Sequence, residues 1–296
     1  MRGQRKWQKQ ECQNQKKDAT FFYVRFKLIR IQHQILSQEI PTPKICIKSR
    51  MELPIFFINL DRDTERRELL QQQFKALSLQ GRRLDAVWWA NLSEEEQARW
   101  YSPALNAKQY YKPLVNGEKG CYASHIKAWQ QLLESDAPAM VVLEDDVQLL
   151  TDFGAAIQAI AQLGQGWDMI KLIGRPKEKI KAERQLTPTH RLIQYQRVPS
   201  STAGYVISRA GAQKLLSSRV PFGRPVDVDI RFWFENGLQV FGVYPSVLGL
   251  DELSEVSSIW AQRERTSATQ RVRKLWMKVQ LFTGNVMSRS PKLPKH

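Results

Sequence analysis

Short apolar runs alternate with segments of helical periodicity through the middle of this 296-residue chain. That alternation constrains the fold most strongly, because it is typical of strands that are separated by covering helices. We therefore expect an α/β fold with a mainly parallel central sheet flanked by helices. The runs that predict strands are 55–59, 140–143, 169–172, 204–208 and 240–244.

Polar capping residues mark where several of the intervening helices begin. Asp63 precedes one predicted helix, and Ser93 with Glu96 forms a capping box for the next. Ser208 precedes a further helix. Helices therefore follow the strands closely, as an α/β layer fold requires.

The least regular part of the middle is the lysine-rich stretch 174–199. It contains one candidate strand, at 192–198, and otherwise has no clear periodicity. We expect a mobile flap here.

The net charge of +16 is concentrated at the two ends of the chain. Residues 1–50 carry 12 Lys or Arg against three acidic residues, and residues 261–296 carry nine against one. A nucleic-acid groove needs basic residues on the folded domain itself, so we expect no nucleic-acid partner. The expected organisation is a disordered basic leader or a mistaken start at 1–50, a catalytic domain at 51–260 and a basic tail at 261–296.

The tail contains the pattern of a basic amphipathic helix, which is typical of interfacial membrane binding. We expect it to bind the anionic surface of the inner membrane, which would make the protein cytoplasmic and peripheral on that membrane's inner face. The alternative is a helix that packs back onto the domain. The apolar stripe is Val272, Leu275, Trp276, Val279 and Phe282, edged by Arg271, Arg273, Lys274 and Lys278.

Three consecutive acidic residues, Glu144, Asp145 and Asp146, directly follow one of the apolar runs. Adjacent carboxylates at the end of a buried strand repel one another unless a hard cation neutralises them. Strand alternation points Glu144 and Asp146 to one side, so we expect these two to bind Mn²⁺ or Mg²⁺, with Asp145 in a supporting role. The alternative is a solvated loop that caps a helix.

The first strand ends in a polar segment suited to a nucleotide. Arg62 and Arg66 could bind phosphate oxygens through their guanidinium forks, and Asn59 or Asp61 could hold a ribose or base. Ordinary capping and ion pairing would use the same residues.

Two further segments offer binding or catalytic groups. Ser124 and His125 follow glycines that precede a predicted helix, whose N-terminus could receive an anion; a structural role is the alternative. Asp227 and Asp229 enter an aromatic segment, where a half-buried carboxylate is suited to general-base catalysis. A helix cap is the alternative there.

These motifs, taken in order, resemble glycosyltransferase family 25, the lipooligosaccharide galactosyltransferases of Gram-negative bacteria. The resemblance covers roughly residues 52–260. It implies a GT-A-type fold, UDP-galactose as donor, Mn²⁺ as metal, inversion at the anomeric carbon and a lipid-linked core oligosaccharide as acceptor. The matching segments are Ile58-Asn-Leu-Asp-Arg62 with Arg66, Gly117-Glu-x-Gly-Cys-x-x-Ser-His125, Leu143-Glu-Asp-Asp146, Gly204-Tyr-x-Ile-Ser-Arg-x-Gly-Ala212 and Pro225-Val-Asp227.

The resemblance also assigns roles to single residues. It places Glu144, Asp145 and Asp146 at the metal and diphosphate and puts Asn59, Asp61 and Arg66 at the nucleotide, and it favours Asp227 over Asp229 as the base. No histidine stands at the exit of the last predicted strand, at 246–251, to complete the metal shell, which leaves a water, Asp251 or another acid as the third ligand.

We therefore expect an inverting, metal-dependent hexosyltransferase that moves galactose from UDP-galactose onto a lipopolysaccharide core saccharide. Two other functions stay open. One is a metal-dependent phosphohydrolase acting on a nucleotide sugar, and the other is a non-catalytic, basic-tailed membrane or nucleic-acid adaptor.

Overall fold

The computed structural model describes residues 52–250, 267–288 and 291–294. The chain divides between Arg50 and Met51 into two units, and every described residue belongs to the second. The predictions for the leader 1–50, and for Asp251 as a metal ligand, fall outside the described residues.

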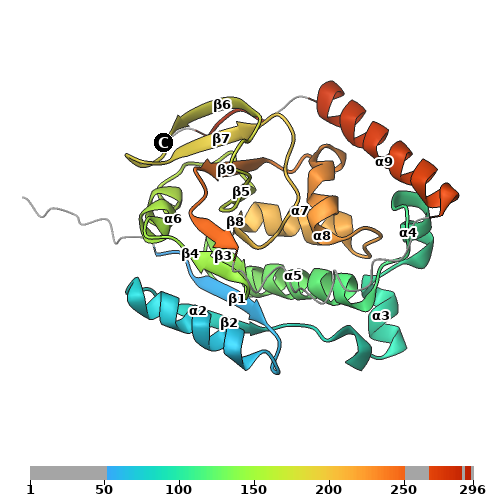
Figure 1. Ribbon diagram of the computed structural model, residues 1–296, viewed down its shortest axis with the longest axis horizontal. Coiled ribbons are helices and arrows are strands. Elements are labelled where there is room, and N and C mark those ends of the chain that lie inside the picture. Colours follow the sequence, from blue (N-terminus) through green and yellow to red (C-terminus); the bar gives the residue numbers. More distant parts are fainter. Residues whose placement is uncertain (1–51, 251–266, 289–290, 295–296) are drawn as a thin grey trace, which may run out of the picture. The chain divides into compact units, whose positions relative to one another are not determined.

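In this described part of the chain, an eight-stranded sheet and a two-stranded sheet form the scaffold (Figure 1). The larger sheet has the order β2-β1-β3-β8-β5-β9-β7-β6, and the smaller one pairs β4 with β10. All five predicted strands are confirmed as β1, β3, β5, β8 and β9. The strands are β1 (Ile55–Asn59), β2 (Gly81–Asp85), β3 (Ala139–Glu144), β4 (Val147–Leu149), β5 (Met169–Lys171), β6 (Ile180–Gln185), β7 (Arg191–Tyr195), β8 (Gly204–Ser208), β9 (Val240–Tyr244) and β10 (Leu248–Leu250).

The larger sheet is mixed, so the prediction of a mainly parallel sheet is wrong. Strand β1 runs parallel to β2 and β3, and β5 runs parallel to β9. Strand β8 lies between β3 and β5 and is antiparallel to both. Apolar runs report burial on both faces and not strand direction, and β8 is as buried as its neighbours. Its reversal was therefore invisible in the sequence pattern.

Most of the stretch predicted to be an irregular flap is a β-hairpin. Strands β6 and β7 pair antiparallel, and β7 continues the large sheet by pairing with β9. The candidate strand at 192–198 is confirmed by β7, whereas β6 was missed because its residues are largely polar and none is fully buried. Movement of the preceding segment 174–179 stays a prediction.

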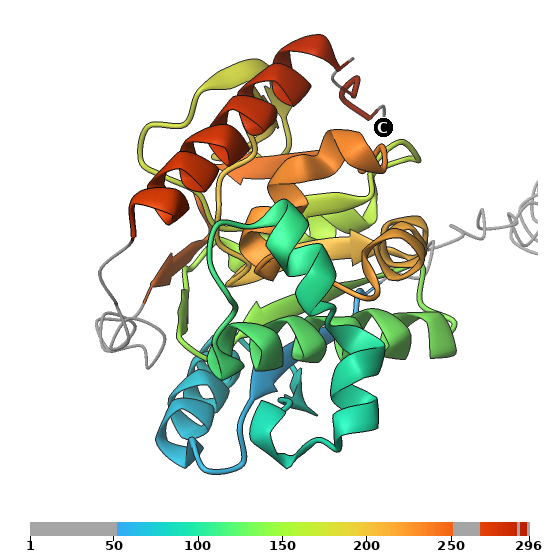
Figure 2. The same cartoon turned by 90° about the vertical axis from the view of Figure 1, so that its right-hand side faces the viewer.

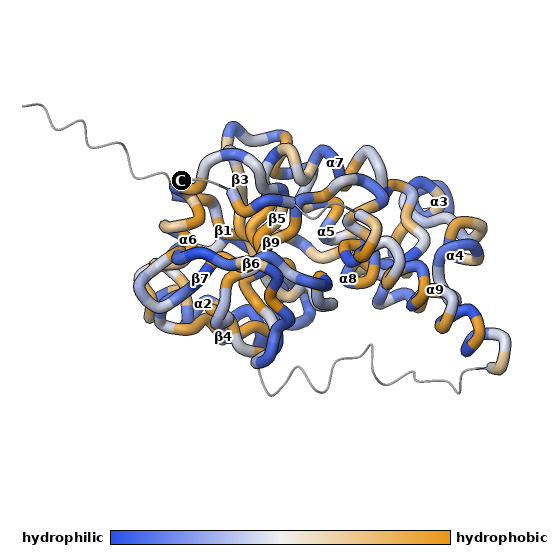
Figure 3. The backbone as a smooth tube through the Cα atoms, turned by 90° about the horizontal axis from the view of Figure 1, so that it is seen from above, coloured by the Kyte–Doolittle hydropathy of each residue, from blue (hydrophilic) through white to orange (hydrophobic). Residues whose placement is uncertain are grey.

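Two hydrophobic cores lie on opposite faces of the large sheet. Met140 and Val142 of β3 belong to one core, and Val141 and Leu143 belong to the other, as strand alternation requires. The central strands are correspondingly apolar (Figure 3). The helices are α2 (Thr64–Ala76), η1 (Trp89–Asn91), α3 (Glu94–Trp100), α4 (Pro103–Gln109), α5 (Asn116–Glu134), α6 (Phe153–Ala161), α7 (Arg209–Arg219), α8 (Val226–Asp229), η2 (Ile230–Glu235) and α9 (Ala268–Met287).

Each core is covered by its own helices. Helices α5 and α7 contribute Trp129 and Leu215 to the first core, and α2 and α6 contribute Phe74 and Ile157 to the second. The predicted capping box is confirmed, since Ser93 Oγ accepts a hydrogen bond from the Glu96 backbone N–H at 3.2 Å. Asp63 and Ser208 are also confirmed as N-terminal boundaries, of α2 and α7.

Helix α9 packs on the domain through one face and leaves its predicted apolar stripe exposed. Met277 and Leu281 are buried, and Trp233 Nε1 of η2 donates a 3.1 Å hydrogen bond to Asn285 Oδ1. Gly284 lies directly against the ring of Phe234, where a Cβ atom would clash. Figure 2 shows the helix, in red, lying across the orange α8–η2 segment. Val272, Leu275, Trp276, Val279 and Phe282 are between 42% and 68% exposed.

The structure tests only one of the two interpretations of the tail. The rival prediction of packing is confirmed for the Met277 face, whereas membrane binding by the stripe remains a prediction. Among the described residues, no helix combines the length and apolarity needed to cross a bilayer.

Candidate active site

Polar side chains from four strands meet at one edge of the large sheet. Strands β1, β3 and β5 end there in Asn59, Glu144 and Lys171. Because β8 runs antiparallel to β3 and β5, the residues just before β8 reach the same edge. The Glu144 backbone N–H donates to the Ala203 carbonyl at 2.8 Å and joins the two segments. Thr202, which sequence analysis missed, thereby lies beside the acidic triplet.

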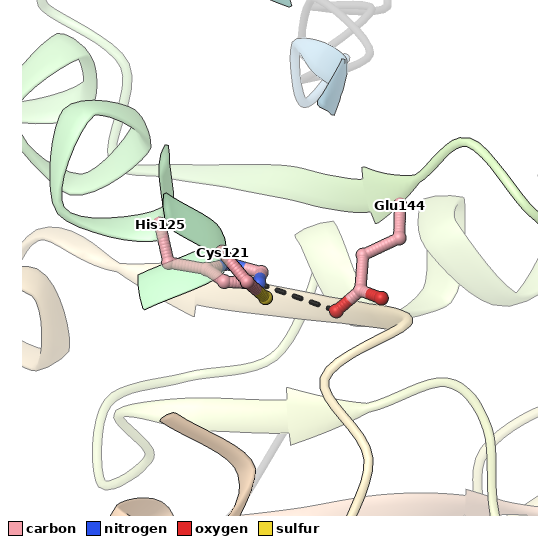
Figure 4. Close-up of side chains that lie close together, drawn as sticks. All are labelled: Cys121, His125 and Glu144. Atoms are coloured by element: carbon pink, nitrogen blue, oxygen red, sulfur yellow. Dashed lines mark hydrogen bonds and ion pairs between the residues drawn. The ribbon is translucent and has the colours of Figure 1, made fainter. Parts of the chain in front are cut away.

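Glu144 points toward His125 (Figure 4) and is held by two side chains. Its Oε1 accepts a hydrogen bond from Thr202 Oγ1 at 2.8 Å and lies 3.3 Å from His125 Nε2. Burial alone would raise the pKa of Glu144, but the hydrogen bonds from His125 and Thr202 and nearby positive charge outweigh it and lower that pKa. Glu144 is therefore a fixed carboxylate.

A chain of buried hydrogen bonds sets the orientation of His125. The indole N–H of Trp129 can only donate, and it donates to the Tyr205 hydroxyl at 2.9 Å. That hydroxyl lies 2.8 Å from His125 Nδ1. Among the described residues, Nδ1 is the acceptor that remains for the hydroxyl proton of Tyr205. The imidazole proton is then on Nε2, where it points at Glu144. The chain explains why residues from α5, β8 and β3 are packed together here.

The thiol of Cys121, the His125 ring and Glu144 lie within 4.8 Å of one another, a spacing that could hold a metal ion. A metal on His125 Nε2 would move the ring proton to Nδ1 and leave the Tyr205 proton without its acceptor. The hydrogen-bond chain therefore favours an orienting role for this cluster over metal binding.

Helix α5 begins earlier than the sequence indicated, which changes the surroundings of Ser124. The glycines predicted to precede the helix lie inside it, and Gly120 packs so closely on the Val87 carbonyl that a Cβ would clash. Ser124 Oγ accepts from the Val87 N–H at 2.8 Å and donates to the Gly120 carbonyl at 2.7 Å. Ser124 and His125 are buried, at 1% and 0% exposure, so neither presents an atom to an anion at the helix N-terminus.

Asp145 is fixed from the neighbouring strand. Asn59 Nδ2 donates to Asp145 Oδ2 at 2.7 Å, and Arg66 Nη1 lies 3.4 Å from Asp145 Oδ1. Burial raises the pKa of Asp145, and these two partners offset part of that rise. Asn59 is itself 1% exposed, so its amide serves Asp145 and not a solvent-facing ligand.

The exposed residues of the predicted nucleotide segment lie at the rim of this network, which Arg83 reaches by donating to Asn59 Oδ1 at 3.2 Å. Arg83 of β2 pairs with Asp61 at 2.6 Å, and the guanidinium of Arg62 stacks on the Trp88 ring at 4.0 Å. Trp88 is 43% exposed and could offer a flat apolar surface to a base. Arg83 and Trp88 were missed, because their proximity to the first strand depends on the β1/β2 pairing.

Asp146 differs from its two neighbours in having a buried oxygen without a partner among the described residues. Its Oδ1 is buried and accepts no hydrogen bond from any described residue. Burial, together with the charges of Glu144 and Asp145, raises the pKa of Asp146 to about 6. An unsatisfied carboxylate beside two other acids is suited to a hard divalent cation. The residues therefore fit Mn²⁺ or Mg²⁺, with Asp146 as the ligand and Glu144 Oε2 free of described partners.

The two aspartates of α8 have different surroundings. Asp227 is half-buried; burial raises its pKa, the charge of Lys171 opposes that rise and the charge of Glu144 adds to it. Burial and the charges of Glu144, Asp227 and Asp146 also raise the pKa of the Cys121 thiol, which lies in the shared field of these acids. Asp227 therefore belongs to the same electrostatic site as the triplet.

Asp229 forms buried ion pairs with two arginines. Its Oδ2 accepts a 2.7 Å hydrogen bond from Tyr122, and its Oδ1 lies 2.7 Å from Arg224 and 3.5 Å from Arg219. The side chain is 3% exposed. Its geometry supports a structural role and leaves Asp227 as the better placed base.

Comparison with known proteins gives a family match for this chain. A family model described as "Glycosyltransferase family 25 (LPS biosynthesis protein)" matches residues 52–230, more than half of the chain. The chain belongs to glycosyltransferase family 25. The resemblance inferred from the ordered motifs is thereby confirmed, and the matched range contains every predicted site residue except Asp251.

Animal members of family 25 are among the similar curated proteins. Procollagen galactosyltransferase 1-B of Xenopus laevis is 30% identical over 184 residues, which are 59% of this chain and 30% of that protein. A glycosyltransferase 25 family member of Anopheles gambiae is 30% identical over 190 residues, 62% of this chain and 32% of that protein. Procollagen galactosyltransferase 2 of Mus musculus is 29% identical over 184 residues, which are 59% of this chain and 29% of that protein. The matched region thus spans about a third of each relative.

Proposed function

We propose that this family 25 protein is an inverting, metal-dependent glycosyltransferase of the GT-A type, which moves galactose from UDP-galactose to a saccharide acceptor. The observation that carries the proposal is the buried, unpartnered Oδ1 of Asp146, at the sheet edge that also holds Glu144 and faces Asp227. Family membership supports an enzyme over a non-catalytic adaptor.

Different residues serve the sugar donor and the acceptor. Asp146 and Glu144 hold Mn²⁺ or Mg²⁺, which when bound neutralises charge on the departing UDP. Asn59 and Arg66 keep Asp145 in place behind them. Asp61, Arg62 and Trp88 offer exposed contacts to the nucleotide.

Asp227 receives the proton of the acceptor hydroxyl. The hydroxyl oxygen then bonds to the anomeric carbon from the face opposite UDP, whose bond to that carbon breaks. Partial burial suits Asp227 to this role, because it raises the proton affinity of a carboxylate that can still reach a ligand. One such base predicts inversion of configuration.

Titration calorimetry with UDP, with and without Mn²⁺, tests the donor site. We expect binding that requires the metal and is lost in Asp146→Asn. Incubating UDP-galactose and UDP-glucose with an acceptor, followed by NMR of the product, tests transfer and inversion. Release of phosphate, or of a nucleotide together with a sugar phosphate, without an acceptor would support the phosphohydrolase alternative, and retention would contradict the single-base mechanism.

For the acceptor we propose a lipid-linked lipooligosaccharide core. The family description names LPS biosynthesis, whereas several relatives are named for procollagen. Parallel assays with delipidated core oligosaccharide and with a procollagen peptide separate these two. Transfer to the peptide alone would overturn the core-saccharide proposal.

We further propose that the exposed stripe of α9 binds the anionic cytoplasmic face of the inner membrane. The stripe contains Leu275, Trp276 and Val279, and the exposed Arg271 and Lys278 on the same helix complement anionic headgroups. The opposite face of α9 packs on η2, which directly follows the helix that carries Asp227. A membrane bound along this stripe would lie near the acceptor side of the site and favour a lipid-linked substrate.

A further inference from the structure

Lys171, the last residue of β5, is a buried lysine with an unusual set of partners. The side chain is 2% exposed, and Nζ donates to the carbonyls of Pro199 at 2.8 Å, Ser200 at 3.3 Å and Ser201 at 2.5 Å. An ammonium group has three protons, so three successive carbonyls use its whole donor capacity. A buried charge is costly unless it is satisfied in this way.

The three carbonyls can converge on one ammonium because the backbone between them curls. Ser201 has a φ of 84°, in the left-handed region that residues other than glycine rarely adopt. Such a conformation persists when surrounding contacts hold it. Lys171 supplies three of those contacts, and Ser201 Oγ adds one by accepting from the Ala203 N–H at 3.3 Å.

The next residue along the chain connects this loop to the acidic triplet. Thr202 Oγ1 donates to Glu144 Oε1 at 2.8 Å, and the Ala203 carbonyl accepts from the Glu144 N–H. Any shift of the curled loop therefore moves two of the groups that fix Glu144, the Thr202 hydroxyl and the Ala203 carbonyl. Lys171 therefore acts on Glu144 through the loop, in addition to the effect of its charge on that carboxylate.

Lys171 also supplies positive charge to the acceptor side of the site. Burial lowers the pKa of Lys171 to about 8, and the carboxylates of Asp227, Glu178 and Glu144 oppose that fall. The same charge opposes the rise that burial causes in the pKa of Asp227. The other charged or titratable groups coupled to Asp227 are Glu144 on β3, Arg231 on η2, Cys121 on α5 and Tyr110 after α4.

We propose that Lys171 is a positioning residue for the transfer reaction, which holds the loop Pro199–Ser201, and with it Thr202, against Glu144 while placing a positive charge beside Asp227. The role rests on the proposed function, because it assigns Lys171 to the geometry of that site. It requires no contact between Lys171 and either substrate.

The test compares Lys171→Met with Lys171→Arg and Lys214→Met. Lys214 is a matched control, because its ammonium binds Asp168, directly before β5, and so lies at the other end of the same strand. We expect K171M to lower kcat roughly a hundredfold through misplacement of the site, with a small change in KM for the donor. In K171M the fall of kcat/KM on the acid side, the acid limb, should occur at a higher pH than in wild type. K171R keeps the positive charge, so in K171R this fall should occur at the wild-type pH.

Hydrogen exchange of the segment 199–204 provides a readout that does not depend on catalysis. Exchange there should accelerate at least tenfold in K171M and stay unchanged in K214M. Thr202→Val should reproduce the fall in kcat without moving the acid limb, which keeps the test available if K171M folds poorly. Unchanged exchange and an unmoved acid limb in K171M would overturn the proposal. If the wild-type protein transfers no sugar while K171M loosens this segment, the proposed function fails and the loop-holding role stands.

Discussion

Asn59 donates a 2.7 Å hydrogen bond to Asp145 across strands β1 and β3, from a side chain that is 1% exposed. The middle acid of the triplet is therefore fixed by a neighbouring strand. Glu144 is fixed separately by Thr202 and His125. Asp146, which has neither kind of partner, is left as the group that a cation would satisfy.

Replacing Asn59 by Leu should destabilise the protein and weaken binding of the UDP-sugar. The change removes donors to Asp145 and to the Asp63 carbonyl, and buried groups left without partners cost about 1–3 kcal/mol. Urea unfolding measures the loss, and calorimetry with UDP and Mn²⁺ measures binding. Asp61→Asn, at an exposed pair with Arg83, should change stability little. Equal stability of the two variants would contradict the role of Asn59.

Asp146→Asn should have opposite effects on stability and on metal binding. The pKa of Asp146 is about 6 in the folded protein and 3.8 in the reference state, so folding favours the protonated form. The stability that Asp146 contributes is then fully present at low pH. It is lost as the pH rises from about 4 to 6, and the loss is at most about 3 kcal/mol. The variant should therefore be more stable than wild type above pH 6 without metal, yet gain nothing from Mn²⁺. Thermal unfolding across pH, with Mn²⁺ or EDTA, provides the measurement, and equal Mn²⁺ stabilisation in both proteins would rule out Asp146 as a ligand.

Asp227→Asn should lower kcat roughly 10²- to 10⁴-fold, the usual contribution of a general base. UDP affinity should stay close to that of wild type, because the metal ligands are intact. In the wild-type enzyme the acid limb of kcat/KM should lie above pH 3.8, since the pKa of Asp227 is raised by burial. Activity should be lost as the pH falls through that raised pKa, and a limb that persists in the variant would assign it to another group.

Arg224→Met should be strongly destabilising without direct participation in chemistry. Arg224 is 2% exposed and pairs with Asp229 at 2.7 Å and Glu235 at 2.5 Å. Removing one partner of a buried ion pair costs about 3–5 kcal/mol, because the remaining charge stays buried. Adding Asp229→Asn should recover part of the loss in a double-mutant cycle followed by urea unfolding. Strictly additive losses would show that the two residues do not act as a pair.

Serine substitution of Leu275, Trp276 and Val279 together should abolish sedimentation with anionic vesicles while leaving the fold intact. These side chains are exposed, whereas Met277 and Leu281 keep the helix on the domain. Leu69→Ser on α2 removes an exposed apolar residue elsewhere and should leave sedimentation unchanged. Wild-type partition of the triple variant would refute the membrane face.

The apolar runs and capping residues were sufficient to place five strands and several helix starts, because burial and capping are local properties of the chain. Strand direction is not local, so the reversal of β8 could not be inferred. The acidic triplet was found from its position after a strand, but the network around it joins residues far apart in sequence. Thr202 and Lys171 became visible only when β8 and β5 were paired. Lys171 in particular resembles an ordinary polar residue at the end of a strand.

The two faces of α9 also determine which experiments on the tail can be interpreted. Deleting the helix would remove the exposed stripe, but it would also uncover Trp233 and Phe234 on η2, immediately after α8 and Asp227. Loss of activity in a truncated protein would therefore have two explanations, detachment from a membrane and disturbance of the α8–η2 segment that carries Asp227. Point substitutions keep the two faces separate, because the exposed Trp276 can be replaced while the buried Met277 holds the helix in place.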